Sequence, residues 1–425
     1  MALRERVAGT HRVPGDKSIT HRALMLAALA PGTSQLRGAL ASLDARSTAR
    51  VLRQLGAGIT PLREGAVISV AGKSRFSAPG HSLDCGNSGT TTRLLLGLLA
   101  GHPFPARLTG DASLRRRPMR RVTSALRAMG AKIDDGGRDG LPLAIIGGKL
   151  RPLDWQMEVP SAQIKSALLL AGLVGGVPVV LREGAATRDH TERLLRHFGF
   201  EVASRDGVLR FAPTGRLVAF ELDVPGDASS AAFLLAAALL ASEGEIRVAA
   251  VGLNPSRTGF LDVLRQMGAV ITIEGVHSPF GEAVGDLVTA PARLRAVDVP
   301  AGAIPGVIDE LPVLSCLAAR AEGVSRFRSV QELRVKESDR LTLLAQNLRA
   351  IGVVAAIEGD DLLVTGTDAP LAGRVVTEGD HRIAMAFSVL GSSGRARIRI
   401  DDPDCAAVSF PGFSGALQRL FEVAR

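Results

Sequence analysis

A unit of about 70 residues recurs six times along this chain of 425 residues, and the repeat constrains the fold more than any other feature. In each copy a short polar motif introduces an apolar run rich in Ala and Leu. The motifs begin at Gly15, Gly86, Pro160, Gly226, Gly306 and Gly379. A second recurring segment ends in a glycine, at Gly56, Gly130, Gly199, Gly268 and Gly352, with a sixth, imperfect copy at 417–420. Because the skeleton is shared, the chemistry must depend on the polar residues that differ.

Each copy predicts a strand, an apolar helix, a strand, an amphipathic helix and then one or two strands. The apolar run is hydrophobic nearly all round, so its helix should be buried. The second helix ends at a glycine that suits the left-handed position after a helix. A β-branched run such as 269–273 follows it and predicts a strand. The fold class expected is therefore mixed α/β (α+β).

The polar motifs stand at the starts of the buried helices, where Asp, Asn and Ser are natural N-caps. Helix starts also present backbone N–H groups and the positive end of the helix dipole, so several of them together would bind anions. The alternative is that the motifs only cap helices. Capping does not require the charged residues Lys17, Arg22, Asp309 and Arg382.

Length and composition predict a globular chain of two domains. The longest unbroken apolar run, 231–241, is too short to cross a bilayer, and 1–6 lacks an apolar signal region. Cys85, Cys316 and Cys405 show no metal-ligand spacing. Three scattered cysteines predict a reducing cytoplasm and no metal site.

The net charge of +9 raises the alternative of a nucleic-acid-binding protein. Aromatic residues make up only 4% and Tyr is absent, so stacking platforms are scarce. The dense run 115–121 is either a solvated turn or part of an anion site. Small anionic substrates explain the charge equally well.

Lysine is rare, since only six of the 51 basic residues are Lys. Lys17, Lys165 and Lys336 lie in or beside the repeat motifs, whereas Lys73, Lys132 and Lys149 resemble surface turn residues. The pKa of a lysine can be shifted far enough for proton transfer, whereas arginine stays protonated.

Six motifs in order carry a family resemblance: GDKSITHR at 15–22, GNSGTTTR at 86–93, the segment 108–119, SAQ at 161–163, RVKESDR at 334–340 and DHRIAM at 380–385. With them the chain resembles the 5-enolpyruvylshikimate-3-phosphate (EPSP) synthase family, the 3-phosphoshikimate 1-carboxyvinyltransferases. The resemblance implies six βαβαββ repeats in two three-repeat domains, 14–224 and 1–13 with 225–425. It also implies a hinge near 13–14 and 224–225, and a substrate cleft between the domains that closes.

The resemblance implies transfer of the enolpyruvyl group of phosphoenolpyruvate to the 5-hydroxyl of shikimate 3-phosphate, with release of phosphate. The reaction belongs to the shikimate pathway to chorismate and the aromatic amino acids. No cofactor or metal is expected. The expected partners are the two small substrates, with no nucleic acid, no membrane and no second subunit.

Roles for residues follow from the same resemblance. Asp309, Glu337 and Lys17 are the expected catalytic residues: Asp309 as the base towards the 5-hydroxyl, and Glu337 as a proton donor to carbon or else an ion-pair residue. Shikimate 3-phosphate is expected to contact Lys17, Ser18, Arg22, Ser161, Ala162, Gln163, Arg188, Asp309 and Lys336. Phosphoenolpyruvate is expected to contact Lys17, Gly89, Arg117, Gln163, Arg340 and Arg382.

Two positions depart from the pattern common in this family. Ala162 replaces a serine, and Val408 with Ser409 stands where many members have a lysine before Phe410. Gly89 predicts inhibition by glyphosate in competition with phosphoenolpyruvate. The nearest alternative is the sister enolpyruvyl transferase family that acts on UDP-N-acetylglucosamine, but its reactive cysteine is absent from 109–118.

Overall fold

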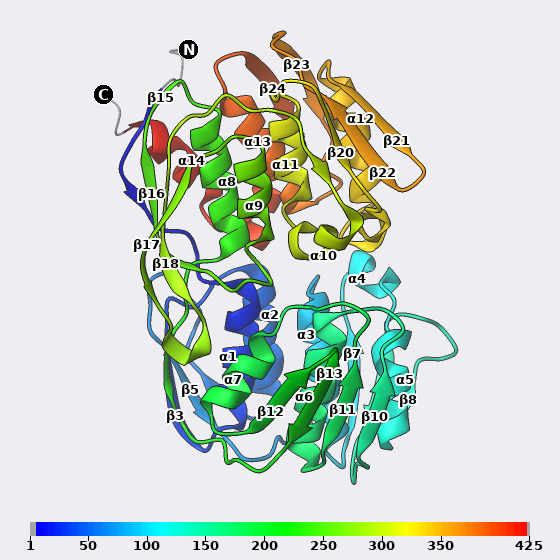
Figure 1. The fold of residues 1–425 in the computed structure, drawn as a ribbon. Coiled ribbons are helices and arrows are strands. Elements are labelled where there is room, and N and C mark those ends of the chain that lie inside the picture. The colour runs from blue at the N-terminus through cyan, green and yellow to red at the C-terminus, as the bar shows by residue number, and fades with distance from the viewer. Residues whose placement is uncertain (1–5, 423–425) are drawn as a thin grey trace. The chain divides into compact units, whose positions relative to one another are not determined.

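The structure, a computed structural model, describes residues 6–422 and divides into two compact units (Figure 1). Unit 1 holds 6–14, 225–278 and 283–422, and unit 2 holds 15–224 and 279–282. The segment 279–282 belongs to unit 2 although its flanking strands belong to unit 1, which the sequence did not indicate. The hinge and cleft stay predictions. Most of the segment 1–6, in which no signal region is expected, lies outside the described residues, which begin at Arg6.

Unit 2 contains three repeats, each with one four-stranded sheet. The first comprises α1 (Lys17–Leu29), β3 (Gly32–Arg37), α2 (Leu43–Gln54), β4 (Gly58–Ile59), β5 (Ile68–Gly72) and β14 (Glu221–Asp223). The second comprises β6 (Leu83–Asp84), α3 (Gly89–Ala100), β7 (Pro105–Thr109), α4 (Ala112–Arg116), α5 (Arg120–Met129), β8 (Lys132–Asp134) and β9 (Leu143–Ile146). The third comprises β10 (Leu153–Gln156), α6 (Ala162–Gly175), β11 (Val179–Arg182), α7 (His190–His197), β12 (Glu201–Arg205) and β13 (Val208–Ala212).

Unit 1 repeats this plan, with β1 (Arg6–Val7) paired to β15 (Glu243–Gly244) at its edge. Its first repeat comprises β2 (Thr10–His11), α8 (Ala228–Leu239), β16 (Ile246–Gly252), α9 (Gly259–Gln266), β17 (Ile271–His277) and β18 (Val284–Thr289), with η1 (Pro279–Gly281) between the last two strands. The next comprises β19 (Asp298–Val299), η2 (Ala301–Ala303), α10 (Ile304–Val307), α11 (Leu311–Ala318), β20 (Val324–Phe327), η3 (Gln331–Val335), α12 (Arg340–Ala350), β21 (Val354–Glu358) and β22 (Asp361–Thr365). The last comprises β23 (Leu371–Val375), α13 (His381–Ser392), β24 (Ala396–Ile400), η4 (Pro403–Val408) and α14 (Phe413–Glu422).

The strand order confirms the βαβαββ repeat and the α/β fold class. In the sheet β6-β7-β9-β8 the first two strands are parallel and the remaining pairs are antiparallel. The sheet β10-β11-β13-β12 has the same order and directions. The last repeat departs from this plan, since its described sheet consists of the parallel pair β23 and β24.

Two repeats take their first strand from a distant part of the chain. Strand β14, which follows the third repeat, pairs in parallel with β3, so that Leu222 lies opposite Leu36. Strand β2 pairs in parallel with β16, so that Thr10 lies opposite Arg247. Each of these two strands therefore completes a sheet of one unit just before the chain passes into the other unit.

The apolar helices are buried, as predicted from their composition. Helices α1, α3 and α6 lie in the core of unit 2, and α8, α11 and α13 lie in that of unit 1. Small residues let them approach closely, because a Cβ on Gly97 of α3 would lie 2.0 Å from the carbonyl oxygen of Ala167 in α6. Among the described helices, no single one is long and apolar enough to cross a membrane. The bent pair Ala301–Val307 and Leu311–Ala318 passes the same test by length and composition when taken together.

The expected helix signals are present at both ends. The glycine after α5, Gly130, has a φ of 111°, a backbone conformation that disfavours residues with a Cβ. The other four repeat glycines also have positive φ: Gly56, Gly199, Gly268 and Gly352. At the starts of the buried helices, capping side chains accept backbone N–H groups of the first turn; these are Asp16, Ser88, Ser161, Asp227 and Asp380. Capping is thus one function of the polar motifs.

Candidate active site

The starts of α3 and α6 in unit 2 are capped by uncharged side chains. Their caps, Ser88 and Ser161, carry no negative charge, so the helix dipoles are not neutralised there. Gln163 joins the two helices: its amide nitrogen donates to Thr90 Oγ1 at 3.0 Å, and its oxygen accepts from Arg93 Nη1 at 2.6 Å. This arrangement suits an anion bound beside Arg93.

Gly89 and Arg117 lie in the same part of unit 2. A Cβ on Gly89 would lie 2.8 Å from Arg93 Nη1 and 3.4 Å from Arg117 Nη1. Arg117 is held by Asn87, whose side-chain oxygen accepts from Nη2 at 2.7 Å. The structure thus brings together three of the residues predicted for phosphoenolpyruvate, namely Gly89, Arg117 and Gln163, around two guanidinium groups.

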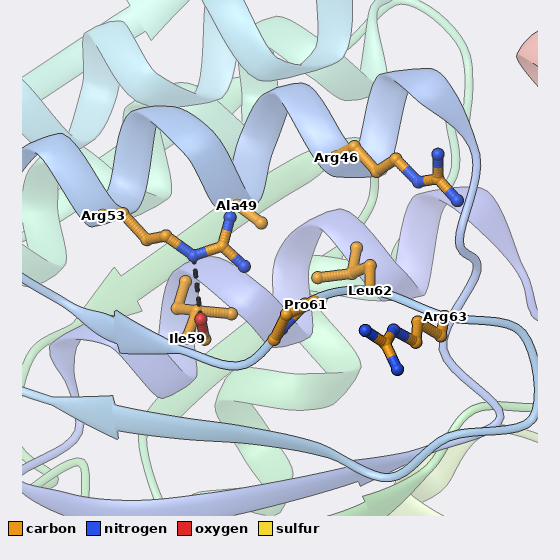
Figure 2. A pocket seen from close by; sticks show the side chains of 7 residues that line it. All are labelled: Arg46, Ala49, Arg53, Ile59, Pro61, Leu62 and Arg63. Atoms are coloured by element: carbon orange, nitrogen blue, oxygen red, sulfur yellow. Dashed lines mark hydrogen bonds between the residues drawn. The ribbon is translucent and has the colours of Figure 1, made fainter.

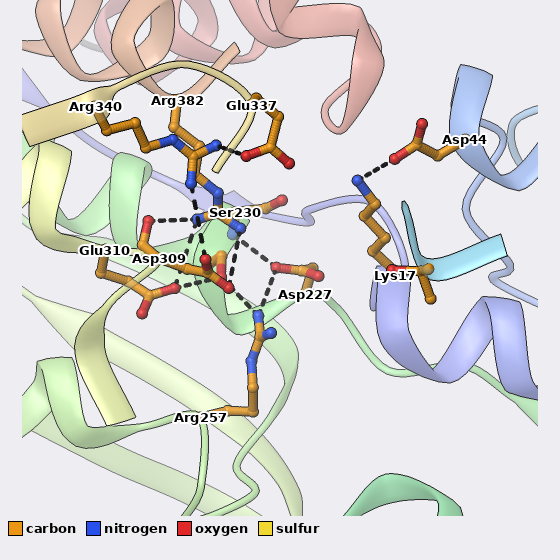
Figure 3. A network of polar contacts seen from close by, with 12 residues as sticks. Lys17, Asp44, Asp227, Ser230, Arg257, Asp309, Glu310, Glu337, Arg340 and Arg382 are labelled. Atoms are coloured by element: carbon orange, nitrogen blue, oxygen red, sulfur yellow. Dashed lines mark hydrogen bonds and ion pairs between the residues drawn. The ribbon is translucent and has the colours of Figure 1, made fainter. Parts of the chain in front are cut away.

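Lys17, the first residue of α1, forms an ion pair with Asp44 of α2 (Figure 3). The Lys17 side chain is 22% exposed and that of Asp44 is 8% exposed, so the pair is only partly open to solvent. Ser18 follows on the same helix turn, and its carbonyl oxygen accepts from Arg22 Nη1 at 2.9 Å. The sequence did not indicate Asp44 as the partner of Lys17.

Arg22 lies deeper than a direct phosphate ligand would require, since it is only 3% exposed. Its Nε donates to Thr191 Oγ1 at 2.7 Å and its Nη2 donates to Ser166 Oγ at 2.6 Å. Burial lowers the pKa of the Arg22 guanidinium to about 10, against the attraction of Glu192. In this structure Arg22 supports the turn that carries Ser18, and contact with phosphate stays a prediction.

Three more residues of unit 2 differ in burial. Lys165 is 3% exposed and lies between Glu183, at 2.9 Å, and Glu192, at 2.8 Å. Burial acts to lower the pKa of Lys165, but the two carboxylates outweigh it and the pKa is raised. Lys165 is therefore a structural cation. Ala162 is the first residue of α6, and Arg188 is half-buried in the segment between β11 and α7.

In unit 1, Arg340 lies at the centre of a carboxylate cluster (Figure 3). Its Nε donates to Asp380 at 2.7 Å, its Nη2 lies 2.6 Å from Glu337, and its Nη1 lies 3.9 Å from Asp309. Burial would lower the pKa of Arg340, but Asp380, Glu337 and Asp309 outweigh it and raise the pKa well above its ordinary value. Glu337 thus forms the ion pair weighed as the alternative to its role as proton donor.

Arg382 and Asp309 form the other half of this cluster. Arg382 Nη1 donates to the Asp309 carbonyl oxygen at 2.6 Å, and Nη2 lies 3.7 Å from the Asp309 carboxylate. Their side chains are 12% and 13% exposed. Lys336, beside Glu337, is half-buried and adjoins the cluster in the chain. The structure therefore brings the predicted residues Asp309, Arg340 and Arg382 together with Glu337.

Sequence reasoning missed several residues of both clusters. Arg93 lies inside a quoted motif, yet it was given no role. Arg257 and Glu310 are buried at 4% and 2% exposure, and both contact Ser229. Arg257 lies outside the repeat motifs, so a search for differences among the motifs passes over it. A basic residue in an Asn-Pro-Ser-Arg turn between a strand and a helix was the available signal.

Unit 2 also has a hollow of about 450 Å³ (Figure 2). It is lined by Arg46, Ala49, Arg53, Ile59, Pro61, Leu62 and Arg63. Arg53 is fixed there, since its Nε donates to the Ile59 carbonyl oxygen at 2.8 Å. None of the predicted site residues lines this hollow.

The three cysteines are free thiols. Burial raises the pKa of Cys85 to about 12 and the pKa of Cys405 to about 12, so neither is a thiolate at neutral pH. Across residues 6–422, no group of three or more His, Cys, Asp or Glu side chains could hold a metal ion.

Comparison with known proteins identifies the family. The family model described as EPSP synthase (3-phosphoshikimate 1-carboxyvinyltransferase) matches residues 2–417. The chain belongs to this family. Among EPSP synthase relatives, a 3-phosphoshikimate 1-carboxyvinyltransferase of Thermus thermophilus is 50% identical, with 97% of this chain and 96% of the relative covered. That of Gluconobacter oxydans is 48% identical, with 97% and 95% covered.

A solved EPSP synthase structure from Acinetobacter baumannii has a TM-score of 0.87 to this chain at 37% identity. The match covers 98% of this chain and 96% of that structure. The family predicted from the six motifs is therefore confirmed. The alternative, the sister family acting on UDP-N-acetylglucosamine, is not supported.

Proposed function

We propose that this EPSP synthase family member transfers the enolpyruvyl group of phosphoenolpyruvate to the 5-hydroxyl of shikimate 3-phosphate, in the shikimate pathway to chorismate and the aromatic amino acids. The observation that carries the proposal is the family match over residues 2–417. The clusters of basic side chains support it, because the two substrates together carry two phosphates and two carboxylates. Arginine forks suit bidentate contacts to both groups.

The proposed chemistry is an addition followed by an elimination. The 5-hydroxyl oxygen bonds to carbon 2 of phosphoenolpyruvate while the methylene carbon gains a proton, giving a tetrahedral ketal phosphate. That methyl group then loses a proton and the bond from carbon 2 to the phosphate oxygen breaks, so phosphate leaves and the enol double bond forms again. Proton transfer and electrostatic positioning suffice for these steps.

Roles are proposed for residues of each unit. In unit 1, Asp309 accepts the proton of the 5-hydroxyl and Lys336 contacts the ring hydroxyls. The proton on carbon is exchanged by Glu337 of unit 1 or by Lys17 of unit 2. Arg340 and Arg382 bind phosphoenolpyruvate. In unit 2, the proposed contacts to phosphoenolpyruvate are Gly89, Arg117 and Gln163, with Lys17 contacting both substrates. The proposed contacts to shikimate 3-phosphate in unit 2 are Lys17, Ser18, Arg22, Ser161, Ala162, Gln163 and Arg188.

The test is phosphate release by the purified protein with both substrates, and with each omitted in turn. Release that requires both substrates supports the proposal. Release with UDP-N-acetylglucosamine in place of shikimate 3-phosphate would show the activity of the sister family instead. If neither acceptor gives release, the family motifs report the fold and not this activity.

We further propose a monomer without cofactor, located in the cytoplasm. The three free thiols support the proposed location. Light scattering on the purified protein tests the first part: a mass near 44.4 kDa fits a monomer, and twice that mass contradicts it. Fractionation of the source cells tests the location. Phosphate release that persists after exhaustive dialysis against a chelator would support the absence of a metal.

A further inference from the structure

The proposed active-site pair of unit 1, Asp309 and Arg382, rests on a buried chain of polar groups that no motif predicted. This chain begins at Arg257, in the turn between β16 and α9, and it reaches Arg382 at the start of α13. Its members belong to three successive repeats of unit 1. They lie within one unit, so the chain is a property of that unit alone.

The first contacts join Arg257 to the start of α8. Arg257 Nη2 donates to Ser229 Oγ at 2.6 Å and lies 3.5 Å from the carboxylate of Asp227, the N-cap of that helix. Figure 3 shows the Arg257 side chain pointing towards Asp227. Arg257 is 4% exposed and Asp227 is 6% exposed. A buried guanidinium is stable only when such partners compensate its charge.

The second contact passes from Ser229 to Glu310. The Ser229 hydroxyl donates its proton to the Glu310 carboxylate, while its oxygen accepts from Arg257. A hydroxyl can donate once and still accept, so the serine joins a cation to an anion without carrying charge itself. Glu310 is 2% exposed, which leaves its carboxylate dependent on protein partners.

The third contact brings the chain to the proposed site. Arg382 Nη1 lies 3.7 Å from Glu310 Oε1 and donates to the Asp309 carbonyl oxygen at 2.6 Å. The orientation of Glu310 therefore fixes one side of the Arg382 guanidinium, and the Asp309 carbonyl fixes another. Rotation of Glu310 would remove the contact on its side of the Arg382 guanidinium.

We propose that Arg257 and Ser229 are positioning residues that hold Arg382, through Glu310, in the orientation in which it binds phosphoenolpyruvate. This inference rests on the proposed function, because phosphoenolpyruvate binding by Arg382 is part of that proposal. Neither Arg257 nor Ser229 touches substrate in this account. Their effect is transmitted through the hydrogen bonds and ion pairs described above.

Replacing Arg257 would remove a positive charge close to the buried carboxylates of Asp227 and Glu310. An Arg257 variant is therefore at risk of not folding. Ser229→Ala is the sharper change, because it breaks the chain and keeps every charge. Ser315→Ala is the matched control: Ser315 is buried in α11 of the same unit, and its hydroxyl donates to the Leu311 carbonyl of its own helix at 2.7 Å. Thermal unfolding of both variants shows whether they are equally folded.

The kinetic experiment measures KM for each substrate and kcat. We expect Ser229→Ala to raise KM for phosphoenolpyruvate about tenfold, while KM for shikimate 3-phosphate changes less than about twofold. Ser315→Ala should match the parent protein. In an Arg382→Lys background, Ser229→Ala should raise KM for phosphoenolpyruvate by a smaller factor than it does alone, because both changes act on the side chain at position 382. Unchanged KM for phosphoenolpyruvate in folded Ser229→Ala would overturn the inference.

A crystal structure of Ser229→Ala separates this inference from the proposed function. If the parent protein releases no phosphate, the proposed function fails, and the position of Arg382 still decides the inference. Loss of the 2.6 Å contact between Arg382 Nη1 and the Asp309 carbonyl oxygen would support positioning. Retention of that contact would contradict it, whatever the activity of the parent protein.

Discussion

At the scale of single residues, the space around Gly89 is set by two arginines. A Cβ there would lie 2.8 Å from Arg93 Nη1 and 3.4 Å from Arg117 Nη1, and these are the far ends of flexible side chains. The backbone need not move, but both guanidinium groups would have to shift. The position therefore tests anion binding without testing stability.

Gly89→Ala should raise KM for phosphoenolpyruvate about tenfold, because it displaces the cations proposed to bind that substrate. KM for shikimate 3-phosphate and the melting temperature should change little. Glyphosate, the inhibitor expected to compete with phosphoenolpyruvate, should lose potency in parallel. Gly80→Ala is the control, since a Cβ on Gly80 meets nothing within 4 Å. Steady-state kinetics decide the point: equal inhibition of the parent protein, Gly89→Ala and Gly80→Ala by glyphosate would refute the proposal that phosphoenolpyruvate binds beside Gly89.

Asp309→Asn should lower kcat by about 10²-fold, because an amide cannot accept the proton of the 5-hydroxyl. KM should move less than kcat, since the amide keeps the shape of the side chain. Asp262→Asn is a control in the same unit, where the Asp262 side chain is 72% exposed. A rise in KM with unchanged kcat would show that Asp309 binds substrate and is not the base.

At the scale of elements, the starts of α1 and α2 are joined by the ion pair between Lys17 and Asp44. The Asp44 side chain is 8% exposed, so loss of Lys17 leaves a largely buried carboxylate. A Lys17 variant alone would therefore mix loss of catalysis with loss of stability. Replacing both partners separates the two effects.

Lys17→Met should abolish turnover and also lower the melting temperature, because Asp44 loses its cation. Adding Asp44→Asn should restore most of the melting temperature and none of the turnover. Calorimetry and phosphate release on both variants provide the measurement. Recovery of activity in the double variant would show that Lys17 serves only to neutralise Asp44.

Helices α3 and α6 approach so closely that a side chain at Gly97 cannot be accommodated. A Cβ there would lie 2.0 Å from the Ala167 carbonyl oxygen, and backbone cannot yield as a side chain does. Gly97→Ala should therefore destabilise unit 2 by about 3 kcal/mol or more, the upper end for overpacked cores. Gly184→Ala, where a Cβ meets nothing within 4 Å, should be neutral. Urea unfolding followed by fluorescence gives both values.

The elements follow from local sequence, whereas their partners do not. Alternating helix and strand signals with glycines such as Gly130 predicted the repeat, because capping and left-handed backbone depend on neighbours in the chain. The pairing of β14 with β3 joins residues far apart in sequence, so no periodicity reveals it. The same limit explains Arg257: its contact with Ser229, and that of Ser229 with Glu310, arise only on folding.

At the scale of the whole molecule, two units share one construction and each has its own core. Unit 2 contains Trp155, the one tryptophan of the chain, in β10, so its fluorescence reports the unfolding of that unit. Unit 2 also contains His21, which is 0% exposed and whose Nδ1 lies 2.7 Å from Thr48 Oγ1. Fluorescence can therefore follow the effect of one buried histidine on one unit.

Burial lowers the pKa of His21 well below 6.5, and the charges of Lys17 and Arg22 add to the effect. The unfolded chain binds a proton at His21 below pH 6.5, while the folded unit does not. Stability is therefore full above pH 6.5 and falls as the pH drops below it, by up to about 1.4 kcal/mol per pH unit from this group. His21→Asn should flatten the pH dependence of urea unfolding between pH 6.5 and 5.

Other titratable groups also change the stability over this pH range. Comparing the pH dependence of two variants cancels the contributions of these groups. Burial raises the pKa of Glu192, against the attraction of Lys165, so this carboxyl stabilises the folded unit as the pH falls, opposite in sign to His21. Glu192 is unchanged in His21→Asn, so its contribution cancels in the comparison with the parent protein. His81→Asn, at an exposed position of the same unit, should leave the slope unaltered. Equal slopes for the parent and His21→Asn would mean that His21 takes up a proton in the folded unit, and its burial would then require a compensating anion.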